Sequence, residues 1–373
     1  MGETIVLGWI VLQLTGSPFV VGAALGARMA PSFFLGIPAG TIADMVDRRV
    51  FMRALNVLLA AMAAGVSLLL FTDSLEVWHL FVLAPMAGAI STLYMTLRNS
   101  YVYDIVGPSH IVNGLAFVGL GTRTGGAIGS VAMGFILANL GWDVAYLALA
   151  VSYLVSAAVL LLIHSRGQAV ATSTGPVWQN LKRFGVEARR NSTLLTLVIM
   201  TALVEVLGFS NQALLPSIAR DVLDVGAVGL GVMGAVRSLG GVVAVLLVIV
   251  LGDRLPKGLA YLFALLVFGA AVLLLGLASN FALAIVAIAV ISGMAALSDV
   301  YSQSMMQVVV PNELRGRSMG AWVLATGTAP LGNLQIGALA SAFTISFALG
   351  VNGIGLVVLA LAGLLLLPKI RRL

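Results

Sequence analysis

Long apolar runs separated by short polar loops make up most of this chain. Of its 373 residues, 60% are hydrophobic and only 9% are charged, and the mean hydropathy is +1.09. A water-soluble protein of this size cannot hide that much apolar surface, because a folded surface in water needs many polar and charged groups. The chain is therefore predicted to be an all-α membrane protein that uses the lipid bilayer as its solvent.

A helix needs about 20 apolar residues to cross a bilayer. Apolar runs occur twelve times, six on each side of a polar segment. The predicted spans lie near residues 3–14, 18–43, 50–71, 77–97, 111–139, 143–164, 192–217, 227–251, 258–277, 280–305, 318–343 and 345–367. This order predicts an N-terminal bundle over residues 1–164, a cytoplasmic linker over 165–191 and a C-terminal bundle over 192–373.

The first predicted span is too short to cross a membrane alone. Residues 3–14 extend about 18 Å as a helix, whereas the hydrocarbon core is about 30 Å thick. We expect an in-frame extension of roughly 10–25 residues that supplies the missing half-span and a cytoplasmic tail. A signal peptide with residues 5–14 as its apolar core is the alternative, although Glu3 and the lack of Lys or Arg before that core argue against it.

Basic residues gather on one side of the predicted membrane. Of the 20 Lys and Arg residues, 16 fall in loops on the Asp44 side, Arg220 alone falls in a loop on the opposite side, and three lie within spans. Positively charged loops stay in the cytoplasm, so Asp44, the linker and both termini are predicted to be cytoplasmic, in a bacterial inner membrane. Because the basic residues are dispersed, the net charge of +6 indicates this orientation rather than a nucleic-acid partner.

Residue types that serve catalysis and metal binding are sparse. The chain has no Cys, and its three His residues, His79, His110 and His164, are far apart in the sequence. Neither a nucleophile with its base nor a set of metal ligands can be assembled from this pattern. The chain is not expected to be an enzyme, and no cofactor or metal is expected.

The two halves carry matching charged positions. Arg28 precedes Asp44 by sixteen residues, and Arg237 precedes Asp253 by sixteen. Each Arg lies in the second predicted span of its half, and each Asp is followed by basic residues. This is the parallel repeat expected of a two-bundle transporter.

Six ionisable residues are predicted to lie inside spans, namely Glu3, Arg28, Arg123, Glu205, Arg237 and Asp299. Each would cost about 3 kcal/mol if it faced lipid at a span centre. We expect them to line a substrate or proton path, or to pair structurally, as Arg28 with Glu3 or Arg237 with Glu205. Arg is effectively always protonated, so only the carboxylates can carry a transported proton. Glu205 lies near the middle of its span and is the best candidate, followed by Glu3 and Asp299, while the arginines are expected to favour an acidic substrate.

Two polar loops carry a family resemblance. Residues 40–49 read GTIADMVDRR, and residues 311–320 read PNELRGRSMG. Both resemble loops of major facilitator superfamily transporters, which usually have a basic residue where Met45 stands and Gly where Asp47 stands. An Asp at the position of Asp47 resembles the pattern of the exporter subgroup that includes macrolide efflux pumps and the enterobactin exporter. The resemblance covers most of the chain and implies two pseudo-symmetric six-helix bundles.

These two loops are expected to form a gate on the cytoplasmic side. Free backbone N–H groups at the start of span 11 make a positive helix end that Asp44 on the facing half can bind. The alternative is that Asp44, Arg48 and Arg49 only anchor a loop. The predicted gating residues are Gly40, Asp44, Arg48, Arg49, Glu313, Arg315 and Arg317.

The fifth span carries a run of glycines, Gly121, Gly125, Gly126 and Gly129. The run resembles the glycine-rich fifth-span motif of family antiporters, with Gly126 where that motif carries Pro and Ser130 where it usually ends in Gly. Glycines four residues apart let two helices approach closely. These positions are therefore expected to pack helices together, with or without a role in transport.

The resemblance implies secondary active transport by alternating access, in which the two halves rock about a central site. We expect a monomer that couples proton entry to the efflux of small organic molecules of the drug or siderophore type. An uptake symporter or uniporter of the same fold is the alternative, because no single residue encodes the direction. A membrane enzyme lacks its catalytic groups here, and a non-transporting sensor would not need buried charges in both halves.

Overall fold

The computed structural model describes residues 1–107, 110–163, 191–251, 256–310 and 315–371. Within these ranges the side chains of residues 36–37, 41, 44, 112, 245–251 and 315–320 are not described. The predicted linker lies outside the described residues except for Asn191, so the division of the chain into domains stays a prediction.

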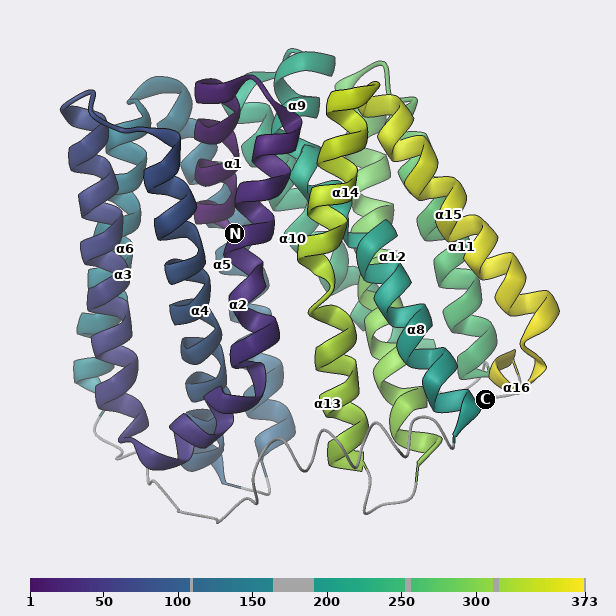
Figure 1. The fold of residues 1–373 in the computed structure, drawn as a ribbon. Coiled ribbons are helices and arrows are strands. Elements are labelled where there is room, and N and C mark those ends of the chain that lie inside the picture. The colour runs from purple at the N-terminus through teal and green to yellow at the C-terminus, as the bar shows by residue number, and fades with distance from the viewer. Residues whose placement is uncertain (108–109, 164–190, 252–255, 311–314, 372–373) are drawn as a thin grey trace.

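Every regular element in the described ranges is a helix, as the sequence predicts. The first half forms α1 Gly2–Thr15, α2 Pro18–Met45, α3 Arg48–Phe71, α4 Val77–Val106, α5 Ile111–Asn139 and α6 Trp142–Leu162. The second half forms α8 Ser192–Leu207, the 3₁₀ helix η1 Phe209–Leu214, α9 Leu215–Ser217, the π-helix η2 Ile218–Val222, α10 Gly226–Leu251, α11 Lys257–Gly276, α12 Phe281–Val308, α13 Arg315–Thr326, α14 Ala329–Ala342, α15 Ile345–Leu366 and α16 Pro368–Arg371. Figure 1 shows the two halves side by side, with α2 next to α14 where they meet.

Nine segments of the described chain are long and apolar enough to cross a membrane. The shorter apolar α1, the glycine-rich α5 and the α13–α14 pair take the other three of the twelve predicted positions. Two of the predicted spans are interrupted. The seventh passes from α8 through η1, α9 and η2, and the eleventh is divided between α13 and α14 at Gly327 and Thr328.

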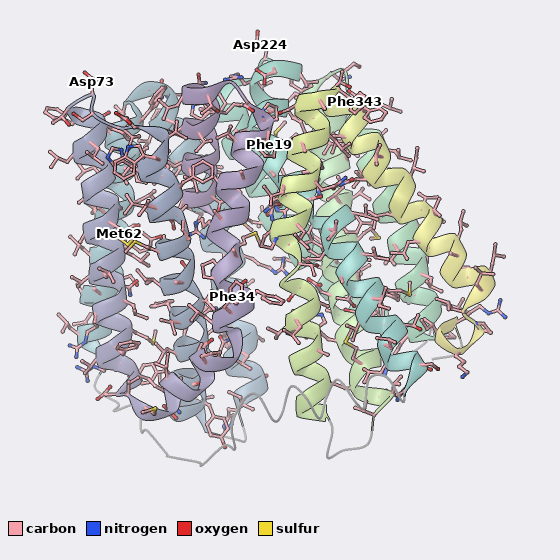
Figure 2. The ribbon with its side chains drawn as sticks, in the orientation of Figure 1. Phe19, Phe34, Met62, Asp73, Asp224 and Phe343 are labelled. Atoms are coloured by element: carbon pink, nitrogen blue, oxygen red, sulfur yellow. The ribbon has the colours of Figure 1, made fainter. Side chains whose placement is uncertain are left out.

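The turns lie at two ends of the molecule, here called the Asp47 end and the Asp73 end after the turns that contain these residues. The Asp73 end lies at the top of Figure 1, and Figure 2 labels Asp73 and Asp224 there. At the Asp47 end, the Asp47 side chain accepts hydrogen bonds from the backbone N–H groups of Arg49 at 3.0 Å and Val50 at 3.1 Å. This contact caps α3 and fixes where it begins, because the first N–H groups of a helix have no intrahelical partner.

The fourth span is longer than predicted. The apolar run ends at residue 97, but α4 continues to Val106 and carries Arg98 and Asp104 within the helix. Arg98, one of the 16 basic residues predicted from the sequence to lie in loops, therefore belongs to a helix. Charged side chains can continue a membrane helix where they face a cavity or a partner instead of lipid, and both do so here.

The two halves pack most closely toward the Asp73 end, where glycines bring helix backbones together. A Cβ added to Gly231 of α10 would lie 2.7 Å from the carbonyl oxygen of Ser130 and 3.0 Å from the Cα of Gly134, both on α5. A Cβ added to Gly337 of α14 would lie 2.9 Å from the carbonyl oxygen of Pro18 on α2. Toward the Asp47 end the contact is looser, since the Phe34 side chain, which lies between the halves in Figure 2, is 72% exposed.

Candidate functional site

The structure brings Glu3, Arg28 and Tyr153 together from three helices of the first half. The Arg28 guanidinium donates to the Glu3 carboxylate from Nε at 3.3 Å and from Nη2 at 2.5 Å, and the Tyr153 hydroxyl donates to the same carboxylate at 2.5 Å. The side chains of Arg28 and Glu3 are 17% and 16% exposed. The arrangement is a satisfied ion pair joining α1, α2 and α6, and it corresponds to the structural pairing considered for these two residues.

A cavity of about 350 Å³ lies between the two halves. It has contributions from α4, α5, η1, α10, α11 and α12, so both halves of the chain form its wall. Among the described residues that line it, the charged side chains are Arg98, Arg123, Arg237 and Asp299. Its volume is at the lower end of the range for small-molecule pockets. Three of the six ionisable residues predicted to lie in spans thus meet at one cavity.

Arg237 is held by an amide and not by a carboxylate. Its Nη2 donates to Oε1 of Gln212 in η1 at 3.0 Å. The Nε2 of Gln212 contacts the sulfur of Met29 on α2 at 3.8 Å, and Nδ2 of Asn333 on α14 approaches the same sulfur at 3.5 Å. Gln212 therefore connects Arg237 to the opposite half of the molecule.

Glu205 lies in α8, is only 8% exposed and does not line the cavity. Within the part of the chain that the structure describes, it has neither a hydrogen bond nor an ion pair, although it lies within electrostatic range of Arg237 and Asp299. The pairing of Arg237 with Glu205 considered from the sequence is therefore not formed as a direct contact. Glu205 is a buried carboxylate next to the charged cavity wall.

Arg123 reaches across to the second half. Its guanidinium lies so close to Gly241 of α10 that a Cβ at this position would overlap Nη1. Gly241 is one turn beyond Arg237 on the same helix, so guanidinium groups from both halves point at one region. Arg123 lies within electrostatic range of Asp299.

Two buried polar atoms on the cavity wall lack a hydrogen-bond partner among the described groups, Nε of Arg98 and Oγ of Ser292. Arg98 does donate from Nη1 to the Thr122 hydroxyl at 3.3 Å. Buried polar groups without partners are costly.

The described gating residues are held within the first half. Arg48 donates from Nη1 to both carboxylate oxygens of Asp104 at 2.7 Å and from Nε to the carbonyl oxygen of Ala43 at 2.9 Å. In this structure Arg48 therefore anchors α3 to α4 and to the end of α2. A Cβ at Gly40 would meet no described atom within 4 Å. The side chains of Asp44, Arg315 and Arg317, and all of Glu313, lie outside the described part of the chain.

Of the four glycines predicted to pack helices, Gly126 lies close to α10 in this structure, and a side chain at the other three would have open space. A Cβ at Gly121, Gly125 or Gly129 would meet no described atom within 4 Å, and one at Gly126 would lie 3.1 Å from Met1 Cγ and from Ser238 Oγ. A closer approach of α5 to α10 is made at Gly134, about two turns beyond Gly126.

Sequence reasoning did not identify Arg98, Gln212, Tyr153 or Ser292 as site residues. Arg98 ended an apolar run and was assigned to a loop, and the other three carry no charge that would mark them against an apolar background. One signal was available for Gln212. It precedes Arg237 by 25 residues, the same offset that separates Glu3 from Arg28.

Comparisons with known proteins agree with the fold. The family model described as "Transmembrane secretion effector" of the major facilitator superfamily matches residues 2–372. The staphyloferrin A transporter of Staphylococcus aureus is 22% identical over 93% of this chain and 87% of its own length. The multidrug efflux pump Tap of Mycobacterium tuberculosis is 36% identical over 25% of this chain and 23% of its own length.

Solved structures of transporters share the fold. The crystal structure of a peptide transporter, POT, matches with a TM-score of 0.82 at 14% identity over 100% of this chain and 92% of that chain. A bacterial homologue of the human lysosomal transporter Spinster, in an inward-facing and unoccupied conformation, matches with a TM-score of 0.68 at 14% identity over 96% of this chain and 95% of that chain. The family model spans nearly the whole chain, so this protein is a multi-pass membrane transporter that belongs to the transmembrane secretion effector family of the major facilitator superfamily.

Proposed function

We propose that this transporter exports small organic molecules by alternating access and that proton entry drives the export. The observation that carries the proposal is the cavity between the halves, which is lined by charged residues and lies beside the buried Glu205. A site shared by two halves can be exposed to either side of a membrane as the halves rock. The close glycine contacts at the Asp73 end support a state in which this end is shut.

The direction of transport is inferred from the relatives. One is named as a staphyloferrin A transporter and another as a multidrug efflux pump, and the second name gives export as the direction. The basic loops predict that the Asp47 end faces the cytoplasm of a bacterial inner membrane. A cavity that opens toward the Asp47 end would then load substrate from inside the cell.

Proton coupling is assigned to Glu205. A coupling group must change its protonation as the site alternates, and among the buried charges only carboxylates can do so. Glu3 is tied by Arg28 and Tyr153, whereas Glu205 has no direct partner within the described chain.

The proposal is tested with the full chain reconstituted in liposomes, with a panel of siderophores, macrolides and dyes and an imposed pH gradient. We expect substrate to accumulate on the acidic side, and we expect Glu205→Gln to abolish this accumulation while energy-independent exchange remains. The matched control is Glu76→Gln, a carboxylate at the Asp73 end outside the spans. If Glu205→Gln still concentrates substrate, the proton site lies elsewhere.

The alternative is an uptake symporter or uniporter of the same fold. The same liposomes decide between them, because a symporter accumulates substrate on the side toward which protons flow and an antiporter on the side from which they come. A uniporter shows no dependence on the pH gradient.

A further inference from the structure

The two halves of the chain place different contact residues next to equivalent arginines. Arg28 and Arg237 occupy matching positions in the repeat, and each is contacted by the residue 25 positions before it. In the first half that residue is Glu3, and in the second half it is Gln212. The contact is therefore present in both halves, with a carboxylate in the first and an amide in the second.

This change decides how much positive charge reaches the cavity. The Glu3 carboxylate cancels the charge of Arg28 in a 2.5 Å ion pair, and Tyr153 donates to the same carboxylate. The amide oxygen of Gln212 orients the guanidinium of Arg237 at 3.0 Å but leaves its charge in place. Arg28 is thus a neutralised structural group, whereas Arg237 presents its charge on the cavity wall.

Two more guanidinium groups line the same cavity. Arg123 reaches it from α5 over the bare backbone of Gly241, and Arg98 lines it from α4 with a buried Nε that has no described partner. Asp299 is the carboxylate on the described wall, and Glu205 lies nearby without lining it. Three cations against one anion leave the wall positive, and such a wall is stabilised by an anionic ligand.

We propose that the cavity binds small organic anions that carry two or more negative charges, and that Gln212 sets this preference by positioning Arg237 without neutralising it. The inference rests on the proposed function in taking this cavity as the transport site. It adds a substrate class and a specificity-determining residue.

The test measures equilibrium binding by calorimetry with the purified full chain in detergent. The probes are benzoate, isophthalate and trimesate, which carry one, two and three carboxylates on the same ring. We expect affinity to rise along this series by about tenfold from the monoanion to the trianion, and to weaken with added salt. Neutral trimethyl trimesate should bind no better than benzoate. Equal binding of all three anions, or tighter binding of the ester, overturns the proposal.

The variants separate charge from contact. Gln212→Glu should pair with Arg237 as Glu3 pairs with Arg28, and we expect it to lose most of the gain from benzoate to trimesate. Met29→Leu removes the sulfur that Gln212 contacts without adding a charge. Affinity should therefore still rise from benzoate to trimesate in this variant. Arg237→Gln should lose the gain in the same way as Gln212→Glu, which covers the case in which Gln212→Glu does not fold. If affinity still rises from benzoate to trimesate as much as in the unchanged protein, in folded Gln212→Glu or in Arg237→Gln, the proposal is overturned.

Binding and transport can fail separately. If affinity rises from benzoate to trimesate while the liposomes show no proton-driven accumulation, the anion site is supported and the proposed proton coupling is wrong. If proton-driven export is measured for some substrate while the three anions bind equally, the export proposal is supported and the anion preference is wrong.

Discussion

At the scale of single residues, Arg48 is the most firmly held charge at the Asp47 end. It is 7% exposed, and its guanidinium makes two hydrogen bonds of 2.7 Å to Asp104 and one of 2.9 Å to a backbone carbonyl. Removing one member of a buried ion pair leaves an uncompensated charge, which costs about 3–5 kcal/mol. This geometry favours an anchoring role for Arg48 over a mobile one.

We therefore expect Asp104→Asn to lower the free energy of unfolding by about 3 kcal/mol, measured by denaturant unfolding of the purified protein. The matched control is Asp221→Asn. Its partner Arg220 lies at 2.6 Å, but the two side chains are 27% and 37% exposed, so the loss should stay below about 1 kcal/mol. Equal losses in the two variants would contradict the assignment of Arg48 as a buried anchor.

At the scale of helices, the contact between α5 and α10 closes the Asp73 end through backbones and not through long side chains. Gly134 and Gly231 face one another, and neither position has room for a methyl group. Gly125, about two and a half turns away on α5, has open space instead. A methyl group would therefore fit at Gly125 of α5 but would clash at Gly134 of the same helix.

Gly231→Ala should force α5 and α10 apart at the Asp73 end, because overpacking of this kind costs roughly 1–3 kcal/mol. The chain has no Cys, so a single Leu25→Cys reports on this end without background, and Leu25 is only 3% exposed. We expect Gly231→Ala to raise maleimide labelling of that cysteine by roughly fivefold or more. Gly125→Ala on the same background should leave labelling unchanged. If Gly231→Ala is labelled no faster than the Leu25→Cys protein with Gly231 unchanged, this contact does not hold the end shut.

At the scale of the whole molecule, the orientation in the membrane rests on the basic loops. Sixteen of the 20 basic residues are predicted from the sequence to lie in loops on one side, or 15 without Arg98, which the structure places in α4. The helices place the turns alternately at the Asp47 and Asp73 ends. The positive side is expected to remain in the cytoplasm.

Reporter fusions after Arg49, Gln168 and Arg317 should therefore report a cytoplasmic location, and fusions at Ser74 and Ser279 an external one. The measurement pairs a reporter active only inside the cell with one active only outside. Reversal at any two of these sites would contradict the predicted arrangement of six spans on each side of the linker.

The sequence predicts the helical class and most of the spans, because apolar runs of the right length have few alternatives in a bilayer. It also identifies Arg123, Arg237 and Asp299, three of the four charged side chains on the described cavity wall, since charge inside a span is costly. Arg98 was assigned to a loop because its charge ended the hydropathy signal, although the cavity accepts that charge. Gln212 and Tyr153 were not found because neutral polar residues gain their meaning only from the partner they touch. Their partners lie 25 and 150 positions away along the chain.

The positive wall of the cavity has an electrical consequence. Outward movement of a dianion with inward movement of one proton transfers three positive charges into the cell for each cycle. Each charge moved through 100 mV of membrane potential releases about 2.3 kcal/mol. With the proposed substrate and direction, the voltage across the membrane would supply more work than the pH difference, and a cell with a collapsed potential but an intact pH gradient would export poorly.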